Sequence, residues 1–192
     1  MKTKVLQIVA CVLIAVVLAG AGVVGLSIGL RSYRAAVRLD DITLDIGTVI
    51  YLASVYRMSY EGENFEADFK TYLSDLVADA YLYALHHGYT FSDRSFVNNT
   101  AKRVLAESAD GSVTEFNDVA KEHGYGFTYT DFRNAIALKY KAAEGRSLMP
   151  EVLGEEGYAE AKAQALSRIV FTDRYTSLDF ATIPNGHEYY FE

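Results

Sequence analysis

Histidine and cysteine are the residues of this chain best suited to metal chemistry, and their spacing does not favour a metal site. His86 and His87 are adjacent, but neighbouring residues on a helix point about 100° apart, so their rings cannot easily share one ion. His123 and His187 lie in no ligand motif, and Cys11 is the single cysteine. A solvated helix end, where positive charge suits the helix dipole, explains the His pair better. We therefore expect neither a metal nor a cofactor.

Other catalytic patterns are also absent from the sequence. Serine hydrolases place the nucleophile on a Gly-x-Ser-x-Gly turn between a strand and a helix, and this sequence has no such motif. Gly20, Gly22 and Gly25 lie in an apolar run and follow no predicted strand, which argues against a nucleotide loop. Glu155 and Glu156 are more typical of a solvated helix start than of a cation site. We predict a protein that is not an enzyme.

Charge and hydropathy divide the chain into two parts. Residues 1–38 carry five basic residues and no acid, whereas residues 39–192 carry 13 basic and 25 acidic residues. The net charge of −7 argues against a nucleic-acid partner. Residues 5–30 are uncharged and exceed the roughly 20 helical residues that a bilayer core requires. We predict an anchor with basic flanks over residues 1–38, in contact with the lipid bilayer. A signal peptide cleaved near Ala19-Gly20-Ala21 is the alternative, and the basic flanks leave the orientation open.

The remaining residues, 39–192, are predicted to form one mainly α-helical domain. Apolar residues recur at three- and four-residue steps, and Gly or capping residues fall where helices should end. Phe96, Thr100 and Val104 are expected on the inward face of the third helix. An Asn185-Gly186 turn between aromatic-rich arms predicts a short C-terminal β-hairpin. The helices are predicted over residues 46–61, 64–87, 92–108, 112–124, 128–145 and 155–171, after a short strand over 42–44.

Aromatic residues are concentrated in the first two predicted helices. A small helical domain cannot bury this many large rings completely, and tyrosine combines an apolar body with a polar hydroxyl. We expect some of them to line an exposed apolar groove suited to extended polypeptide.

The order of the residues that begin and end the predicted helices is specific enough to compare with known families. It runs through Ala84-Leu85-His86-His87-Gly88-Tyr89, Ser92-Asp93, Phe116, Gly124 and Thr128-Tyr129-Thr130-Asp131-Phe132-Arg133. This order resembles the N-terminal domain of SurA/PrsA-type chaperones, and Gly88-Tyr89-Thr90-Phe91-Ser92-Asp93 is most similar to membrane-anchored Gram-positive versions. The residues after Arg146 are too few for the prolyl-isomerase domain common in that family, so isomerase activity is not implied.

The resemblance implies a single-pass protein of the cell membrane, with a cytoplasmic N-terminus and an extracytoplasmic SurA-like domain over residues 39–192. It further implies non-catalytic binding of unfolded or secreted polypeptides. The alternative is a structural helical subunit of a cell-envelope complex with one dedicated partner. Our candidate peptide-binding residues are Tyr56, Phe69, Tyr72, Leu76, Phe132, Ile136 and Tyr140.

Overall fold

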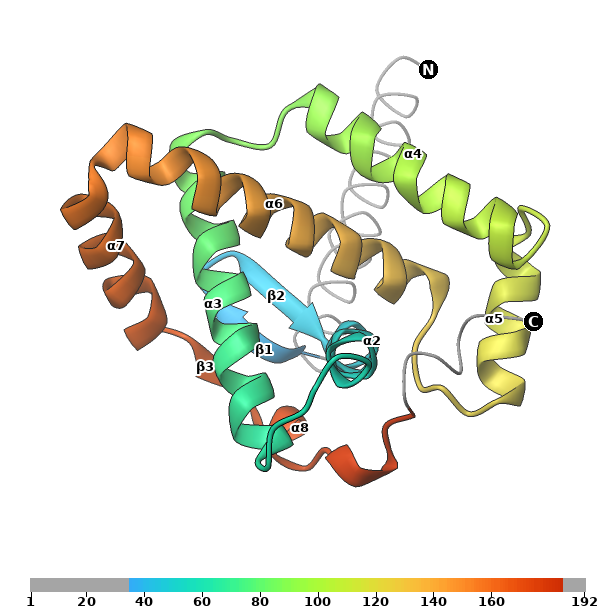
Figure 1. The fold of residues 1–192 in the computed structure, drawn as a ribbon. Helices are drawn as coiled ribbons and strands as arrows, with labels where there is room; N and C mark the ends of the chain where they lie inside the picture. The colour runs from blue at the N-terminus through green and yellow to red at the C-terminus, as the bar shows by residue number, and fades with distance from the viewer. Residues whose placement is uncertain (1–34, 185–192) are drawn as a thin grey trace, which may run out of the picture. The chain divides into compact units, whose positions relative to one another are not determined.

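The computed structural model describes residues 35–184, which form mainly helices and a small three-stranded sheet (Figure 1). Residues 1–34 of the predicted anchor, and the turn and second arm of the predicted C-terminal hairpin, lie outside these residues. Within the described part of the chain, no helix is both long enough and apolar enough to cross a membrane. The longer helices are α2 (Ile46–Arg57), α3 (Phe65–His86), α4 (Phe91–Ser108), α5 (Val113–Glu122), α6 (Tyr129–Leu153) and α7 (Glu155–Ser167); α8 (Asp173–Thr176) and the 3-10 helix η1 (Phe180–Thr182) are short.

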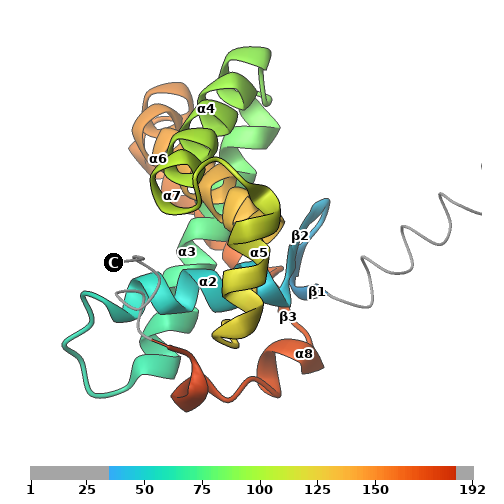
Figure 2. The ribbon, with the colours of Figure 1, turned by 90° about the vertical axis from the view of Figure 1, so that its right-hand side faces the viewer.

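The sheet joins the beginning of the described chain to its last third. Strands β1 (Ala35–Leu39), β2 (Ile42–Asp45) and β3 (Val170–Phe171) have the order β2-β1-β3, and β1 pairs antiparallel with β3, placing Val37 opposite Phe171. The prediction of a strand at 42–44 is confirmed. Residues 35–38, which we expected in the basic flank of the anchor, instead form part of a strand whose apolar side chains are buried. Figure 2 shows this sheet beside α2 and α3, with which it shares the larger core.

Helices α3 and α6 form the centre of the domain and cross closely (Figure 1). Asn64, where the sequence predicted this helix to begin, caps α3 by accepting a hydrogen bond from the Ala67 amide. The prediction that Gly145 ends the next-to-last long helix is wrong, because α6 continues through it to Leu153. A Cβ at Gly145 would lie 2.3 Å from the carbonyl oxygen of Asp79. The missing side chain therefore permits a close helix crossing rather than a helix end.

Helix α4 is rotated relative to our expectation. The buried residues along it are Asp93, Val97, Ala101 and Leu105, one position beyond the stripe of Phe96, Thr100 and Val104 that the sequence suggested. Its N-cap is Thr90 rather than Ser92, in a reciprocal capping box with Asp93. Asp93 also accepts hydrogen bonds from the buried Tyr83 and the half-buried Tyr140, and these bonds fix the helix rotation.

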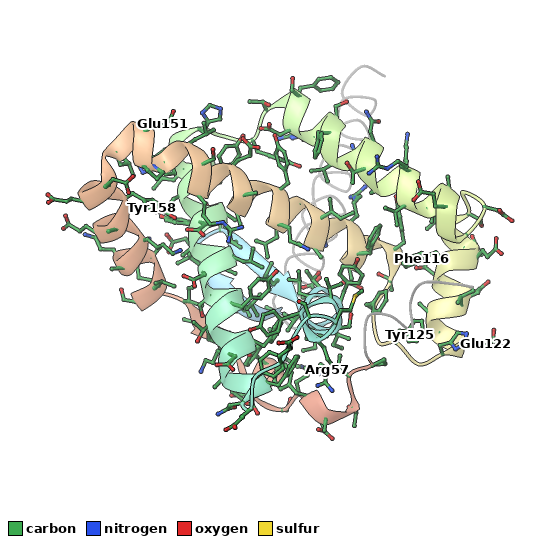
Figure 3. The ribbon with its side chains drawn as sticks, in the orientation of Figure 1. Arg57, Phe116, Glu122, Tyr125, Glu151 and Tyr158 are labelled. Atoms are coloured by element: carbon green, nitrogen blue, oxygen red, sulfur yellow. The ribbon has the colours of Figure 1, made fainter. Side chains whose placement is uncertain are left out.

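Helices α4 and α5 and the start of α6 enclose a second, smaller core, which includes Phe116, Tyr125, Phe127 and Phe132. Figure 3 shows Phe116 on α5 and Tyr125 in the loop that follows it. Ser112 caps α5, and Thr128 and Asp131 form the predicted capping box of α6. The starts of these two helices are therefore where the sequence indicated.

The C-terminal region departs from prediction at both of its elements. Helix α7 ends at Ser167, and residues 170–171 form β3 instead of continuing the helix. Residues 178–183, expected as the first arm of a hairpin, contain η1 instead of a strand. Asp179 caps η1 by accepting from the Ala181 amide, and Phe180 packs 5.8 Å from the Phe69 ring. In this segment, helix capping and aromatic packing thus outweigh the preference for a hairpin that the Asn-Gly turn and its aromatic arms suggested.

Candidate functional site

The seven residues proposed as peptide-binding do not form one surface. Phe69 and Leu76 of α3 and Phe132 of α6 are buried in the two cores. They are therefore not available to a ligand in this structure. The four remaining candidates are half-buried: Tyr56, Tyr72, Ile136 and Tyr140.

Tyr56 and Tyr72 belong to an aromatic cluster that holds α2 against α3. Their rings stack at 4.7 Å, and Tyr56 also contacts the Phe65 ring at 5.8 Å. The Arg57 guanidinium lies 4.3 Å from the Phe65 ring centre and donates a hydrogen bond to the Phe180 carbonyl. Figure 3 shows Arg57 beside this cluster. Each of these rings packs on neighbours of the same cluster. The chief role of the cluster is therefore structural.

Tyr140 lies in the middle of α6, where it contacts Asp93 at the start of α4. The Asp93 carboxylate is 7% exposed and accepts hydrogen bonds from Tyr140 (2.9 Å), Tyr83 (3.0 Å) and the Thr90 amide (2.8 Å). Burial alone would raise the pKa of Asp93, but these hydrogen bonds outweigh it and hold that pKa below its ordinary value. This carboxylate joins the end of α3, the start of α4 and the middle of α6.

A mixed aromatic and basic surface surrounds this buried carboxylate. The Phe96 ring lies 5.0 Å from the Tyr140 ring. Two cations contact the Tyr89 ring, with Lys141 at 4.2 Å and Arg94 at 5.6 Å from its ring centre. We call these five residues, Tyr89, Arg94, Phe96, Tyr140 and Lys141, the α4–α6 patch.

The apolar part of the patch is accessible. Phe96 is 55% exposed, although its ring is held on one side by Tyr140. Phe91, the first residue of α4, is 86% exposed. Apolar rings that are exposed close together can form part of an interaction surface. Ile136 lies one helical turn before Tyr140 on α6 and is half-buried against the smaller core.

Burial and neighbouring charges shift the pKa values of two residues of the patch. Burial and the hydrogen bond to Asp93 raise the pKa of Tyr140 to about 12, so its hydroxyl stays protonated at neutral pH. Burial and the neighbouring Arg94 lower the pKa of Lys141. In the described part of the chain, no group of three or more His, Cys, Asp or Glu side chains is placed to hold a metal ion. The patch presents rings and positive charge.

A second polar cluster attaches α7 to α3. Asp79 is fully buried on α3, and its carboxylate accepts from the Tyr158 hydroxyl at 2.7 Å and lies 3.1 Å from the Lys162 ammonium. Figure 3 shows Tyr158 pointing from α7 toward α3. Lys162 also pairs with Asp75 at 3.0 Å. Because these contacts are internal, they serve to dock α7.

Of the patch, the sequence identified only Tyr140 as a candidate. Phe96 was assigned to the buried side of its helix, Tyr89 entered only as part of the helix-boundary motif, and Arg94 and Lys141 lie in no motif. The signal that could have found them is the Thr90–Asp93 capping box: it starts the helix two residues before Ser92 and turns Asp93 inward. With Asp93 inward, Val97 and not Phe96 continues the buried stripe.

Comparison with known proteins gives no class for this fold and site: no family model, curated protein or solved structure matches the chain.

Proposed function

We propose that this protein is a membrane-anchored, non-catalytic chaperone that binds unfolded or secreted polypeptides outside the cytoplasm. The anchor is the apolar run over residues 5–30, and residues 39–192 form the binding domain, similar to SurA/PrsA N-terminal domains. The observation that carries the proposal is Phe96: an aromatic side chain that is more than half exposed yet positioned by a buried hydrogen-bond network through Tyr140.

Two further features support polypeptide as the ligand. Phe91 and Phe96 present apolar surface along the first turns of one helix, and such surface gains free energy when an apolar side chain covers it. Helix α4 buries a narrow stripe with small residues such as Ala101, so its other faces remain available for contact. An extended chain lacking its own core supplies the complementary apolar groups.

The test follows the aggregation of chemically unfolded citrate synthase by light scattering. The full-length protein is used in lipid nanodiscs, with empty nanodiscs as a blank. We expect suppression near stoichiometric ratios. Phe96→Ser should raise the ratio needed for half suppression by about fivefold, since covering half of a Phe side chain contributes roughly 1 kcal/mol.

Val152→Ser is the matched control, because Val152 is 59% exposed on the same scale but lies near the far end of α6. It should suppress aggregation as the unchanged protein does. Equal loss in both variants would show that exposed apolar area in general, and not the α4–α6 patch, is responsible. No suppression by the folded protein would contradict the chaperone proposal and favour a structural subunit with one dedicated partner.

A further inference from the structure

The α4–α6 patch carries positive charge in a strongly acidic domain. Residues 39–192 have 13 basic against 25 acidic residues, yet Arg94 and Lys141 both contact the ring of Tyr89. Neither side chain makes an ion pair within the described part of the chain. Two neighbouring cations without a carboxylate partner repel each other, and an added anion would relieve that repulsion.

The nearest carboxylate is not available to them. One oxygen of Asp93 accepts from Tyr140, and the other accepts from Tyr83 and the Thr90 amide. These bonds direct Asp93 into the domain. The N–H donors of Arg94 and Lys141 must therefore find acceptors in solvent or in a ligand.

We propose that the α4–α6 patch prefers polypeptide segments in which acidic residues lie close to an aromatic or aliphatic residue. This inference rests on the proposed function and specifies the class of polypeptide bound. The apolar side chain packs on Phe96 and Tyr140, and a carboxylate accepts hydrogen bonds from Arg94 and Lys141. Burial and Arg94 lower the pKa of Lys141, whereas the Asp93 carboxylate acts in the opposite direction. A bound carboxylate would add to the effect of Asp93 by favouring the charged ammonium.

The experiment measures the binding of short fluorescein-labelled peptides to the full-length protein in nanodiscs of zwitterionic lipid, by fluorescence anisotropy. The peptides share one Phe-containing core and differ in the flanking residues, which are Glu, Gln or Lys. We expect the Glu peptide to bind about fivefold tighter than the Gln peptide, and the Lys peptide to bind weakest, as expected for partly exposed ion pairs. Raising the salt concentration should reduce the difference.

The double variant Arg94→Gln, Lys141→Gln should bring the ratio between the Glu and Gln peptides close to one. Lys139→Gln, an exposed cation on the same helix, should leave the ratio as it is. Phe96→Ser should weaken binding of every peptide by a similar factor. This pattern separates the charged contact from the apolar one.

The remaining outcomes each decide against the inference. Equal affinity for all three peptides would overturn the acidic preference and leave the proposed function standing. An acidic preference that survives the double variant would place the contact elsewhere on the protein. Retention on anionic lipid vesicles that depends on Arg94 and Lys141, without a peptide preference, would identify a lipid headgroup as the ligand. Absence of any peptide binding would overturn both proposals.

Discussion

Gly145 lies where α6 crosses α3, and replacing it with alanine sets two opposing effects against each other. In a helix interior, Gly→Ala stabilises by about 1 kcal/mol, because alanine loses less conformational entropy on folding. Here the new Cβ would lie 2.3 Å from the Asp79 carbonyl oxygen and 3.4 Å from the Cβ of Tyr83. A carbon–oxygen contact normally requires about 3.3 Å, so the helices would have to separate by about 1 Å.

The crowding should be the larger effect. The obstacle is backbone, which cannot rotate away as a flexible side chain can, and overpacking a core typically costs about 1–3 kcal/mol, occasionally more. A gap of that size also forfeits part of the dispersion energy along the whole α3–α6 contact. Taking about 3 kcal/mol for the crowding, we expect Gly145→Ala to destabilise the protein by about 2 kcal/mol. For a chain of this size, that lowers the Tm by roughly 4–8 °C.

The assay is thermal unfolding of the full-length protein in a mild detergent, followed by circular dichroism at the helical band. Gly157→Ala is the control: Gly157 lies in α7, and an added Cβ there would meet only the Leu153 Cβ at an ordinary 3.5 Å. It should leave the Tm unchanged or raise it slightly. If Gly145→Ala were as stable as Gly157→Ala, the close crossing of α3 and α6 would be refuted.

Two further predictions concern the buried carboxylates. Asp93→Ala should destabilise the protein by about 2–4 kcal/mol in the same assay, because Tyr83, Tyr140 and the Thr90 amide lose their acceptor. Since the pKa of Asp93 is lowered in the folded state, its contribution to stability should be present above about pH 4 and be lost as the pH falls further. The Asp93→Asn variant should therefore lose less stability than the unchanged protein in an acid titration. Lys162→Met should destabilise the protein by about 2 kcal/mol and speed amide exchange in α7, because the fully buried Asp79 loses its closest cation. Lys139→Met is the control and should change neither. Although burial lowers the pKa of Lys162, its hydrogen bonds to Asp75 and Asp79 outweigh burial and raise that pKa, so the contribution of Lys162 to stability should be lost as the pH rises above about 10.5.

The starts of α3, α5 and α6 were predictable because capping is local, whereas the Thr90 cap of α4 was missed in favour of Ser92. Asn64, Ser112 and Thr128 each accept a hydrogen bond from an amide three residues later, and this geometry depends on the neighbouring sequence alone. Other predictions failed where a contact between distant parts of the chain determines the local structure. Gly145 was interpreted as a helix end, yet its role is set by the Asp79 backbone 66 positions earlier in the chain.

The candidate site was harder to predict than the fold for the same reason. Whether Phe96 faces the core depends on the rotation of α4, and that rotation follows from hydrogen bonds between Asp93 and tyrosines on two other helices. Periodicity could not distinguish the stripe through Phe96 from the one through Val97, because both recur every four residues. The residues that sequence reasoning favoured, such as Phe69 and Phe132, are the large rings that a core claims first.

The same buried network bears on the choice between a chaperone and a dedicated subunit. Asp93 fixes the start of α4 against α3 and α6, whereas farther along the helix the buried stripe consists of Ala101, Leu105 and Ala109. Small side chains bury little apolar area, so this part of α4 is held less strongly than a Leu-rich helix would be. A helix that is fixed at its start and held less strongly along the rest of its length suits a surface that binds different polypeptide segments. A subunit with one tight partner would gain more from a rigid face, so polypeptide binding remains the function that we propose.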